Sequence, residues 1–105
     1  MSGLILLNTA SAGTLESSDC LVTVSPAEKL KLEYKGANSE IFAERTKAIV
    51  ENVLKKYGLG GAEISIQDQG ALEITIKARL ETAVSRACRG RPDNEALPFD
   101  ALHTG

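Results

Sequence analysis

Residues 63–77 decide the fold, and they read EISIQDQGALEITIK. Apolar residues occupy every second position on both sides of the centre of this stretch: Ile64, Ile66, Leu72, Ile74 and Ile76. A period of two is expected when one face of a β-sheet is buried and the other meets water. The central Asp68-Gln69-Gly70 has the composition of a tight hairpin turn. The stretch therefore predicts two antiparallel strands joined by a hairpin.

Two further strands are expected before this stretch. The segment from Cys20 to Ser25 is rich in β-branched residues and is followed by Pro26, which is typical of a strand and its end. From Leu30 to Tyr34 apolar residues again alternate with charged ones. Only a few residues connect the two segments, so we predict that these strands are hairpin partners.

Two segments instead have the period of a helix. The first runs from about residue 39 to Gly58, which can adopt the left-handed conformation that ends a helix. Its apolar stripe consists of Phe42, Ile49, Val50, Val53, Leu54 and Tyr57. The second helix is expected over residues 78–89, where Gly90 and Pro92 stop it.

The predicted order of elements is ββαββα. With one apolar face per strand and one apolar stripe per helix, an α+β fold in two layers is favoured. It consists of a four-stranded, mainly antiparallel sheet with two helices on one face. We expect residues 1–19 to be a flexible N-terminal segment, residues 20–90 the α+β domain, and residues 91–105 a C-terminal tail.

Composition and charge exclude several classes of function. The chain has 105 residues, 43% of them hydrophobic and 25% charged, which suits one ordinary globular domain. Its net charge is −2 with both signs interspersed, so it lacks the basic face that nucleic acids need. The apolar run at residues 3–7 is too short to span a bilayer and lacks the basic region of a secretory signal. We therefore expect a cytoplasmic protein that binds neither nucleic acid nor membrane.

No group of residues predicts self-contained catalysis or a metal site. His103 is the only histidine and lies two residues from the C-terminus. Cys20 and Cys88 do not have the spacing of zinc ligands and are expected to be reduced, partly buried thiols. The glycine-rich residues 58–61 follow a helix, so they are interpreted as its cap and not as a phosphate-binding loop. Asp68 and the glutamates are expected to lie on the solvated surface.

The segment from Leu15 to Asp19 places two hydroxyl groups between two acidic side chains, just before the strand that begins at Cys20. A serine is a poor nucleophile without an adjacent base, and no histidine or lysine is close in sequence. Ser17 is therefore better suited to being modified by another enzyme than to attacking a substrate. The alternative is that Ser17, Ser18 and Asp19 merely form a polar turn.

The residues Ala12-Gly13-Thr14-Leu15-Glu16-Ser17-Ser18-Asp19 closely resemble the N-terminal signature of the citrate lyase acyl carrier proteins, the gamma subunits of that enzyme. Residues 68–72 and 78–81 look like a second hairpin and the start of the last helix of the same family. The tail Ala96-Leu97-Pro98-Phe99 is similar to the Pro-aromatic ending of the family. Together these matches bracket nearly the whole chain.

The resemblance implies that the serine directly after Glu16 carries 2′-(5″-phosphoribosyl)-3′-dephospho-coenzyme A through a phosphodiester. By position this serine is Ser17. Ser18 falls where related carriers have serine or glycine, which makes it the weaker candidate. A dedicated holo-carrier synthase attaches the group in that family. Glu16 and Asp19 either help this enzyme to recognise the site or only solvate a surface turn.

The family also implies two catalytic partners. The thiol of the prosthetic group holds an acetyl thioester, and the alpha subunit, a transferase, exchanges acetyl for citrate and releases acetate. The beta subunit, a lyase, then cleaves the citryl thioester to oxaloacetate and regenerates the acetyl carrier. The carrier supplies no acid or base, because its physical role is to make delivery of the thioester intramolecular.

Three alternatives remain open at the level of sequence. The carrier subunit of malonate decarboxylase uses the same prosthetic group for a different acyl thioester, although the matches in the second half of the chain favour citrate lyase. A noncatalytic α+β module that binds a protein partner would leave Ser17 unmodified. The apolar cluster of residues 97–102 either docks on a partner subunit or is a disordered end. The helical acyl carriers are not an alternative, because strands are expected here and their Asp-Ser-Leu motif is absent.

Overall fold

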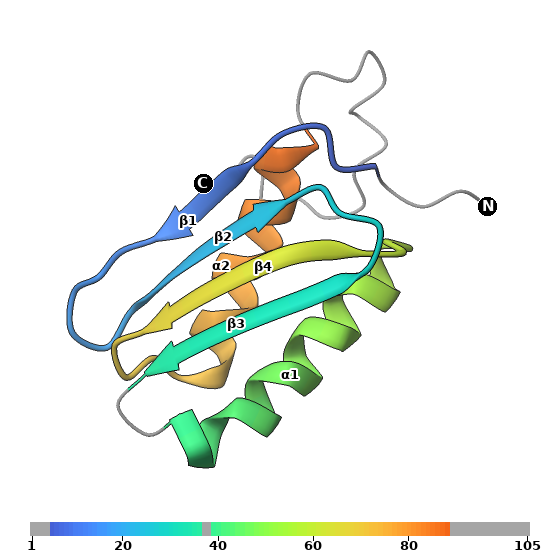
Figure 1. The fold of residues 1–105 in the computed structure, drawn as a ribbon. Helices are drawn as coiled ribbons and strands as arrows, with labels where there is room; N and C mark the ends of the chain where they lie inside the picture. The colour runs from blue at the N-terminus through green and yellow to red at the C-terminus, as the bar shows by residue number, and fades with distance from the viewer. Residues whose placement is uncertain (1–4, 37–38, 89–105) are drawn as a thin grey trace.

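The segment from Ala62 to Asp68 is the most regular strand, because every second residue along it is buried. The computed structural model describes residues 5–36 and 39–88. Its elements occur in the order βββαβα (Figure 1). They are β1 Ala10–Gly13, β2 Cys20–Ser25, β3 Leu30–Gly36, α1 Ser39–Lys56, β4 Ala62–Asp68 and α2 Glu73–Ala87.

The four strands form one mixed sheet in the order β1-β2-β4-β3. β1 pairs with β2, and β2 with β4, in antiparallel fashion, whereas β3 and β4 are parallel. The prediction that β2 and β3 are hairpin partners is wrong, because β4 lies between them. The inward residues of β4 are all buried and those of β3 only half-buried, so burial favours β4 in the centre and β3 at the edge.

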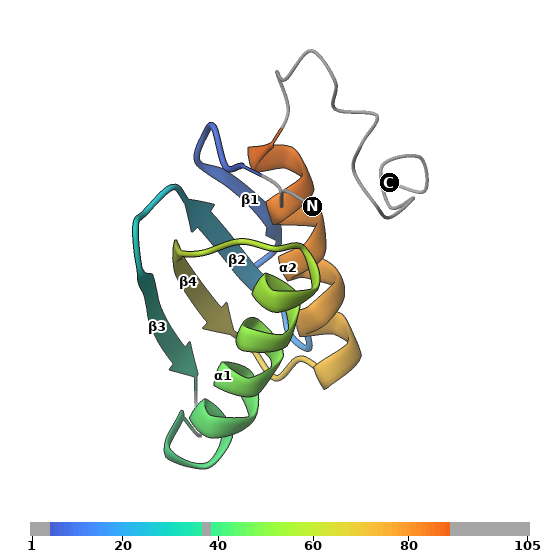
Figure 2. The same cartoon turned by 90° about the vertical axis from the view of Figure 1, so that its right-hand side faces the viewer.

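Both helices cover the same face of the sheet, as Figure 2 shows. α1 is the crossover that connects the parallel strands β3 and β4, since such strands cannot be joined by a hairpin. The core between the layers is built from Val22 and Val24 of β2, Ile64 and Ile66 of β4, and apolar residues of both helices. The predicted α+β class, with a four-stranded sheet and two helices on one face, is confirmed.

The predicted strand over residues 72–77 is wrong, because these residues form the first turns of α2. Gly70 has a φ of +93°, and the Asp68 carboxylate accepts hydrogen bonds from the backbone amides of Gly70 and Ala71. The chain therefore leaves β4 through a tight turn into a helix and not through a hairpin. Leu72 and Ile74 are 70% and 74% exposed, whereas Ile76 is buried. The alternation thus exists in sequence but does not correspond to a buried face.

Strand β1 was not predicted, and it lies within the segment expected to be flexible. It has only four residues, Ala10 to Gly13, and their side chains are too small to give a periodic signal. The chain before it is also held, because the amides of Leu7 and Asn8 donate to the carbonyl oxygen of Ala87 at the end of α2. The sheet therefore begins well before residue 20, while the predicted tail of residues 91–105 lies outside the described residues.

The end of α1 agrees with the sequence analysis. Gly58 has a φ of +69°, and the amide of Leu59 donates to the carbonyl oxygen of Leu54. This is the 6→1 hydrogen bond of the Schellman motif that ends many helices. Residues 58–61 thus form a helix cap and a connection to β4. In the part of the chain that the structure describes, no helix is long and apolar enough to cross a membrane.

Candidate functional site

The predicted modification site lies in the β1–β2 loop, residues 14–19, at the end of the sheet where β4 turns into α2 (Figure 1). The amide of Asp19 donates to the carbonyl oxygen of Glu16 at 3.1 Å, which closes a tight turn with Ser17 and Ser18 at its two central positions. Ser18 has a φ of +68°, the conformation that the third residue of a type II turn requires. Both serines are exposed.

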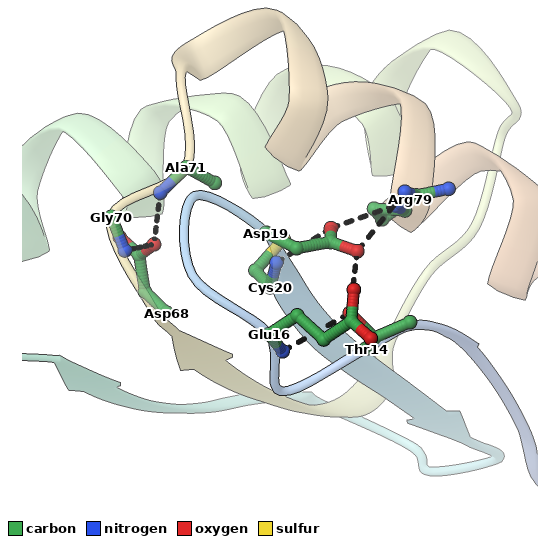
Figure 3. Close-up of polar contacts among 8 residues, drawn as sticks. All are labelled: Thr14, Glu16, Asp19, Cys20, Asp68, Gly70, Ala71 and Arg79. Carbon is green, nitrogen blue, oxygen red and sulfur yellow. Dashed lines mark hydrogen bonds and ion pairs between the residues drawn. The ribbon is translucent and has the colours of Figure 1, made fainter.

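Asp19 ties this turn to α2 (Figure 3). Its two carboxylate oxygens accept hydrogen bonds from Nε and Nη2 of Arg79, at 3.0 and 3.1 Å. The same carboxylate also accepts from the Thr14 hydroxyl at 2.8 Å and from the Cys20 amide at 2.7 Å. Thr14 in turn accepts from the amide of Glu16. We call the bidentate pair of Asp19 and Arg79 the clasp, because it joins the loop to a residue 60 positions away.

The clasp strongly favours the charged form of Asp19. Hydrogen bonds from Arg79, the Cys20 amide and Thr14 lower the pKa of Asp19 from 3.8 to about 2. Asp19 in turn raises the pKa of Arg79. Both partners are therefore charged throughout the neutral range.

A second attachment joins the loop to the β4–α2 turn. The amide of Ser18 donates to the carbonyl oxygen of Gln69 at 2.7 Å, and the amide of Gln69 donates to the carbonyl oxygen of Asp19 at 2.8 Å. Gly13 permits the close approach of the two ends of the loop. Its φ is +98°, and a Cβ atom there would lie 1.9 Å from the carbonyl oxygen of Cys20. The loop is thus held on both sides of Ser17.

Ser17 itself has the chemistry of an acceptor and not of a nucleophile activated in place. Among the described residues no side chain makes a hydrogen bond with its hydroxyl, so no base within this part of the chain is set to remove its proton. The nearby Cys20 is buried, and its burial raises the pKa of the thiol to about 11. The loop therefore presents an unactivated hydroxyl to the outside.

Asp68 does not lie on the solvated surface, as the sequence analysis expected, but is buried. In addition to the turn amides of Gly70 and Ala71, it accepts a hydrogen bond from the Tyr34 hydroxyl, and Nη2 of Arg45 lies 3.7 Å away. Burial and this hydrogen bond raise the pKa of Tyr34 to about 12. These contacts make Asp68 the residue that holds the turn on which the β1–β2 loop rests.

A cavity of about 250 Å³ lies beside the same turn, lined by Tyr34, Phe42, Arg45, Asp68 and residues 70–72. The Arg45 guanidinium stacks over the Phe42 ring at 4.5 Å, and its Nε lies 3.9 Å from Glu73. No histidine lies within the described residues, and none of their acidic, cysteine or histidine side chains gather into a metal site. His103 falls outside those residues. Both cysteines are buried, as their predicted role as small hydrophobic residues requires.

Sequence reasoning predicted a site at Ser17, Ser18, Glu16 and Asp19 but missed the residues that hold this loop. Arg79 entered the sequence analysis only as part of the family match over residues 78–81, and Gln69 only as part of an expected hairpin turn. Glu16 is exposed, and its backbone, not its carboxylate, makes the contacts of the turn. A charged pair 60 positions apart leaves no local pattern, so nothing in a single sequence indicates it.

A family model described as "Malonate decarboxylase delta subunit (MdcD)" matches residues 7–87. A solved structure, "Crystal structure of a Pseudomonas malonate decarboxylase hetero-tetramer in complex with malonate", contains a chain with the same fold. The TM-score is 0.68 and the identity is 22%, over 82% of this chain and 90% of that chain.

Curated relatives share considerably more of the sequence. A citrate lyase acyl carrier protein of Treponema denticola is 46% identical over 78 residues, which are 74% of this chain and 90% of the relative. That of Halothermothrix orenii is 42% identical, over 83% of this chain and 94% of the relative. That of Serratia proteamaculans is 39% identical, over 91% of this chain and 92% of the relative.

Proposed function

Since this chain belongs to the family of citrate lyase acyl carrier proteins, we propose that it is the acyl carrier subunit of a citrate lyase and that Ser17 bears its prosthetic group. Acyl carrier proteins of this family hold their acyl group on a covalent prosthetic group. The proposed prosthetic group is 2′-(5″-phosphoribosyl)-3′-dephospho-coenzyme A, joined to the Ser17 oxygen by a phosphodiester.

The observation that carries the proposal is the exposed Ser17 hydroxyl on a turn that is fixed at both ends. A phosphodiester requires an accessible hydroxyl oxygen with room for a large substituent, and Ser17 meets this requirement. When bound, the group supplies a thiol that carries the acyl thioester between active sites. The chain itself contributes a fixed point of attachment, so delivery to each partner depends on effective concentration.

The proposed partners are the alpha subunit, an acyl transferase, the beta subunit, a citryl lyase, and a holo-carrier synthase. The carrier acts without an acid or a base of its own. The cytoplasmic location stays a prediction of the sequence.

A malonate decarboxylase carrier is the second candidate, because the family model bears that enzyme's name and the solved structure comes from such a complex. Sequence identity favours the carrier of citrate lyase. Eight curated relatives with that name are 38–46% identical to this chain, against 22% for the chain in the malonate decarboxylase structure.

The attachment site is tested by intact-mass and peptide mass spectrometry of the chain coexpressed with its modifying enzymes. We expect one coenzyme adduct on Ser17, its loss in Ser17→Ala, and its retention in Ser18→Gly. The glycine variant is the matched control because it removes the second hydroxyl and suits the positive φ of that position. An adduct that persists in Ser17→Ala contradicts the assignment.

The choice of enzyme is tested with the purified native complex. Citrate cleavage and malonate decarboxylation are assayed with the carrier, without it, and after it is added back. We expect citrate cleavage to require the modified carrier and the Ser17→Ala variant to restore none. Malonate decarboxylation without citrate cleavage would instead favour the second candidate.

A further inference from the structure

The β1–β2 loop contains two adjacent serines, and the modifying enzyme must use one of them and not the other. Ser17 and Ser18 are both exposed, and their hydroxyl groups are chemically equivalent. Reactivity therefore cannot distinguish them, but the backbone conformation of the loop can. Ser18 has a φ of +68° and its amide is bound to Gln69, whereas Ser17 occupies the preceding, ordinary position of the turn.

The turn is set by residues outside the pair of serines. Glu16 and Asp19 close it through one backbone hydrogen bond, and Asp19 is the end that is anchored to the rest of the fold. The anchor is the clasp, in which the planar guanidinium of Arg79 meets both carboxylate oxygens. Such a bidentate pair fixes the orientation of a carboxylate as well as its distance. Arg79 thus determines the turn from α2 without contacting either serine hydroxyl.

We propose that Arg79 is a positioning residue that, through the clasp, presents Ser17 and not Ser18 to the modifying enzyme. This inference rests on the proposed function, since it concerns which hydroxyl is modified. Because Ser17 has an ordinary backbone conformation and the turn is fixed, its hydroxyl lies in the same place in every molecule. Without the clasp only backbone hydrogen bonds hold the positive φ of Ser18, and a non-glycine residue leaves that conformation readily.

The step that the clasp serves is the formation of one P–O bond. The Ser17 oxygen attacks the phosphorus of a phosphoanhydride form of the coenzyme, and its proton passes to a base of the modifying enzyme. The anhydride P–O bond breaks, and the leaving phosphate group departs with the electron pair. In such a displacement an error of about 1 Å in the position of the attacking atom costs on the order of 100-fold in rate.

The test compares Arg79→Gln and Asp19→Asn with the unchanged chain in a time course with the holo-carrier synthase. We expect the rate of modification at Ser17 to fall roughly 10- to 100-fold, and peptide mapping to find a larger share of the adduct on Ser18. Arg86→Gln is the matched control. It removes another arginine of α2, whose hydrogen bond goes to the carbonyl oxygen of Ser11 in β1, outside the loop.

A rescue variant separates positioning from direct recognition of Arg79 by the enzyme. Asparagine tolerates the left-handed conformation better than serine, so Ser18→Asn should rebuild the turn in the Arg79→Gln background. We expect the double variant to regain severalfold of the lost rate at Ser17. Thermal unfolding checks that each variant is folded. If Arg79→Gln does not fold, the nearly isosteric Asp19→Asn is used for the test in its place.

Two results overturn the inference. One is unchanged rate and unchanged site in both Arg79→Gln and Asp19→Asn; the other is a loss of rate that Ser18→Asn does not relieve. Either result leaves the proposed function intact as long as the unchanged chain is modified on Ser17. No adduct on the unchanged chain is a different failure, because it removes the proposed function itself.

Discussion

Asp19 shows how much one side chain can organise. It accepts hydrogen bonds from a guanidinium, a hydroxyl and a backbone amide, and its own backbone closes the turn that holds the serines. Hydrogen bonds to a charged carboxylate are roughly twice as strong as those between neutral groups. Asp19 therefore holds the structure of the loop together. This role differs from the two that the sequence suggested, recognition by the modifying enzyme and solvation of a surface turn.

The charge of Asp19 gives a prediction about pH. Its pKa is about 2 in the folded protein against 3.8 ordinarily, so its contribution to the loop is complete above about pH 4 and is lost between about pH 4 and 2. We expect carboxyl-carbon NMR titration to give a midpoint near 2. In Arg79→Gln the midpoint should rise toward 3.8, since Arg79 is the largest cause of the shift. A midpoint near 3.8 in the unchanged chain would contradict the clasp.

At the scale of elements, the segment from Leu72 to Ile76 is the most instructive. Its alternating apolar residues suit a strand, but Gly70 and the Asp68 carboxylate direct the chain into α2. Within the helix, Ile76 and Leu80 are four residues apart and point to the core together. Leu72 and Ile74 then remain exposed. The local β preference of this segment is overridden by the turn before it and by the core beneath it.

Two alanine substitutions distinguish the helix from the predicted strand. Ile76→Ala should lower the free energy of unfolding by about 2–5 kcal/mol, because it removes a fully buried side chain. Ile74→Ala should change it by less than about 0.5 kcal/mol, slightly in the stabilising direction, since alanine is the better helix former. Urea denaturation measures both. Similar losses at the two positions would indicate that they share a buried face, as in a strand.

At the scale of the whole molecule, the sheet depends on the parallel pairing of β3 with β4 after the α1 crossover. The pairing begins where Leu30 lies beside Ala62, and the residues just before each strand approach closely. A Cβ atom on Gly61 would lie 2.4 Å from the backbone oxygen of Glu28. Glycine at this position therefore lets the crossover return to the sheet in register.

Substitutions at the neighbouring Gly60 and Gly61 test the close contact between Gly61 and the backbone of Glu28. Gly61→Ala should destabilise the fold by about 1–3 kcal/mol, because the backbone of Glu28 cannot move aside freely. Gly60→Ala should change stability by less than about 1 kcal/mol, since a Cβ atom there meets nothing within 4 Å. Thermal unfolding followed by circular dichroism compares them. Equal effects of the two substitutions would count against a close contact at Gly61.

The sequence alone determined the class of the fold, the helix that Gly58 caps, and the strands from Cys20 and Leu30, and it singled out the serines of the loop as candidates. These features are local, because a cap, a period or a motif is contained within a few neighbouring residues. Only the tertiary structure decided the central position of β4, the helical state of residues 73–77, the short strand β1 and the clasp of Asp19 with Arg79. Each of these depends on burial or on contacts between residues far apart in the chain, and such contacts leave no period in the sequence.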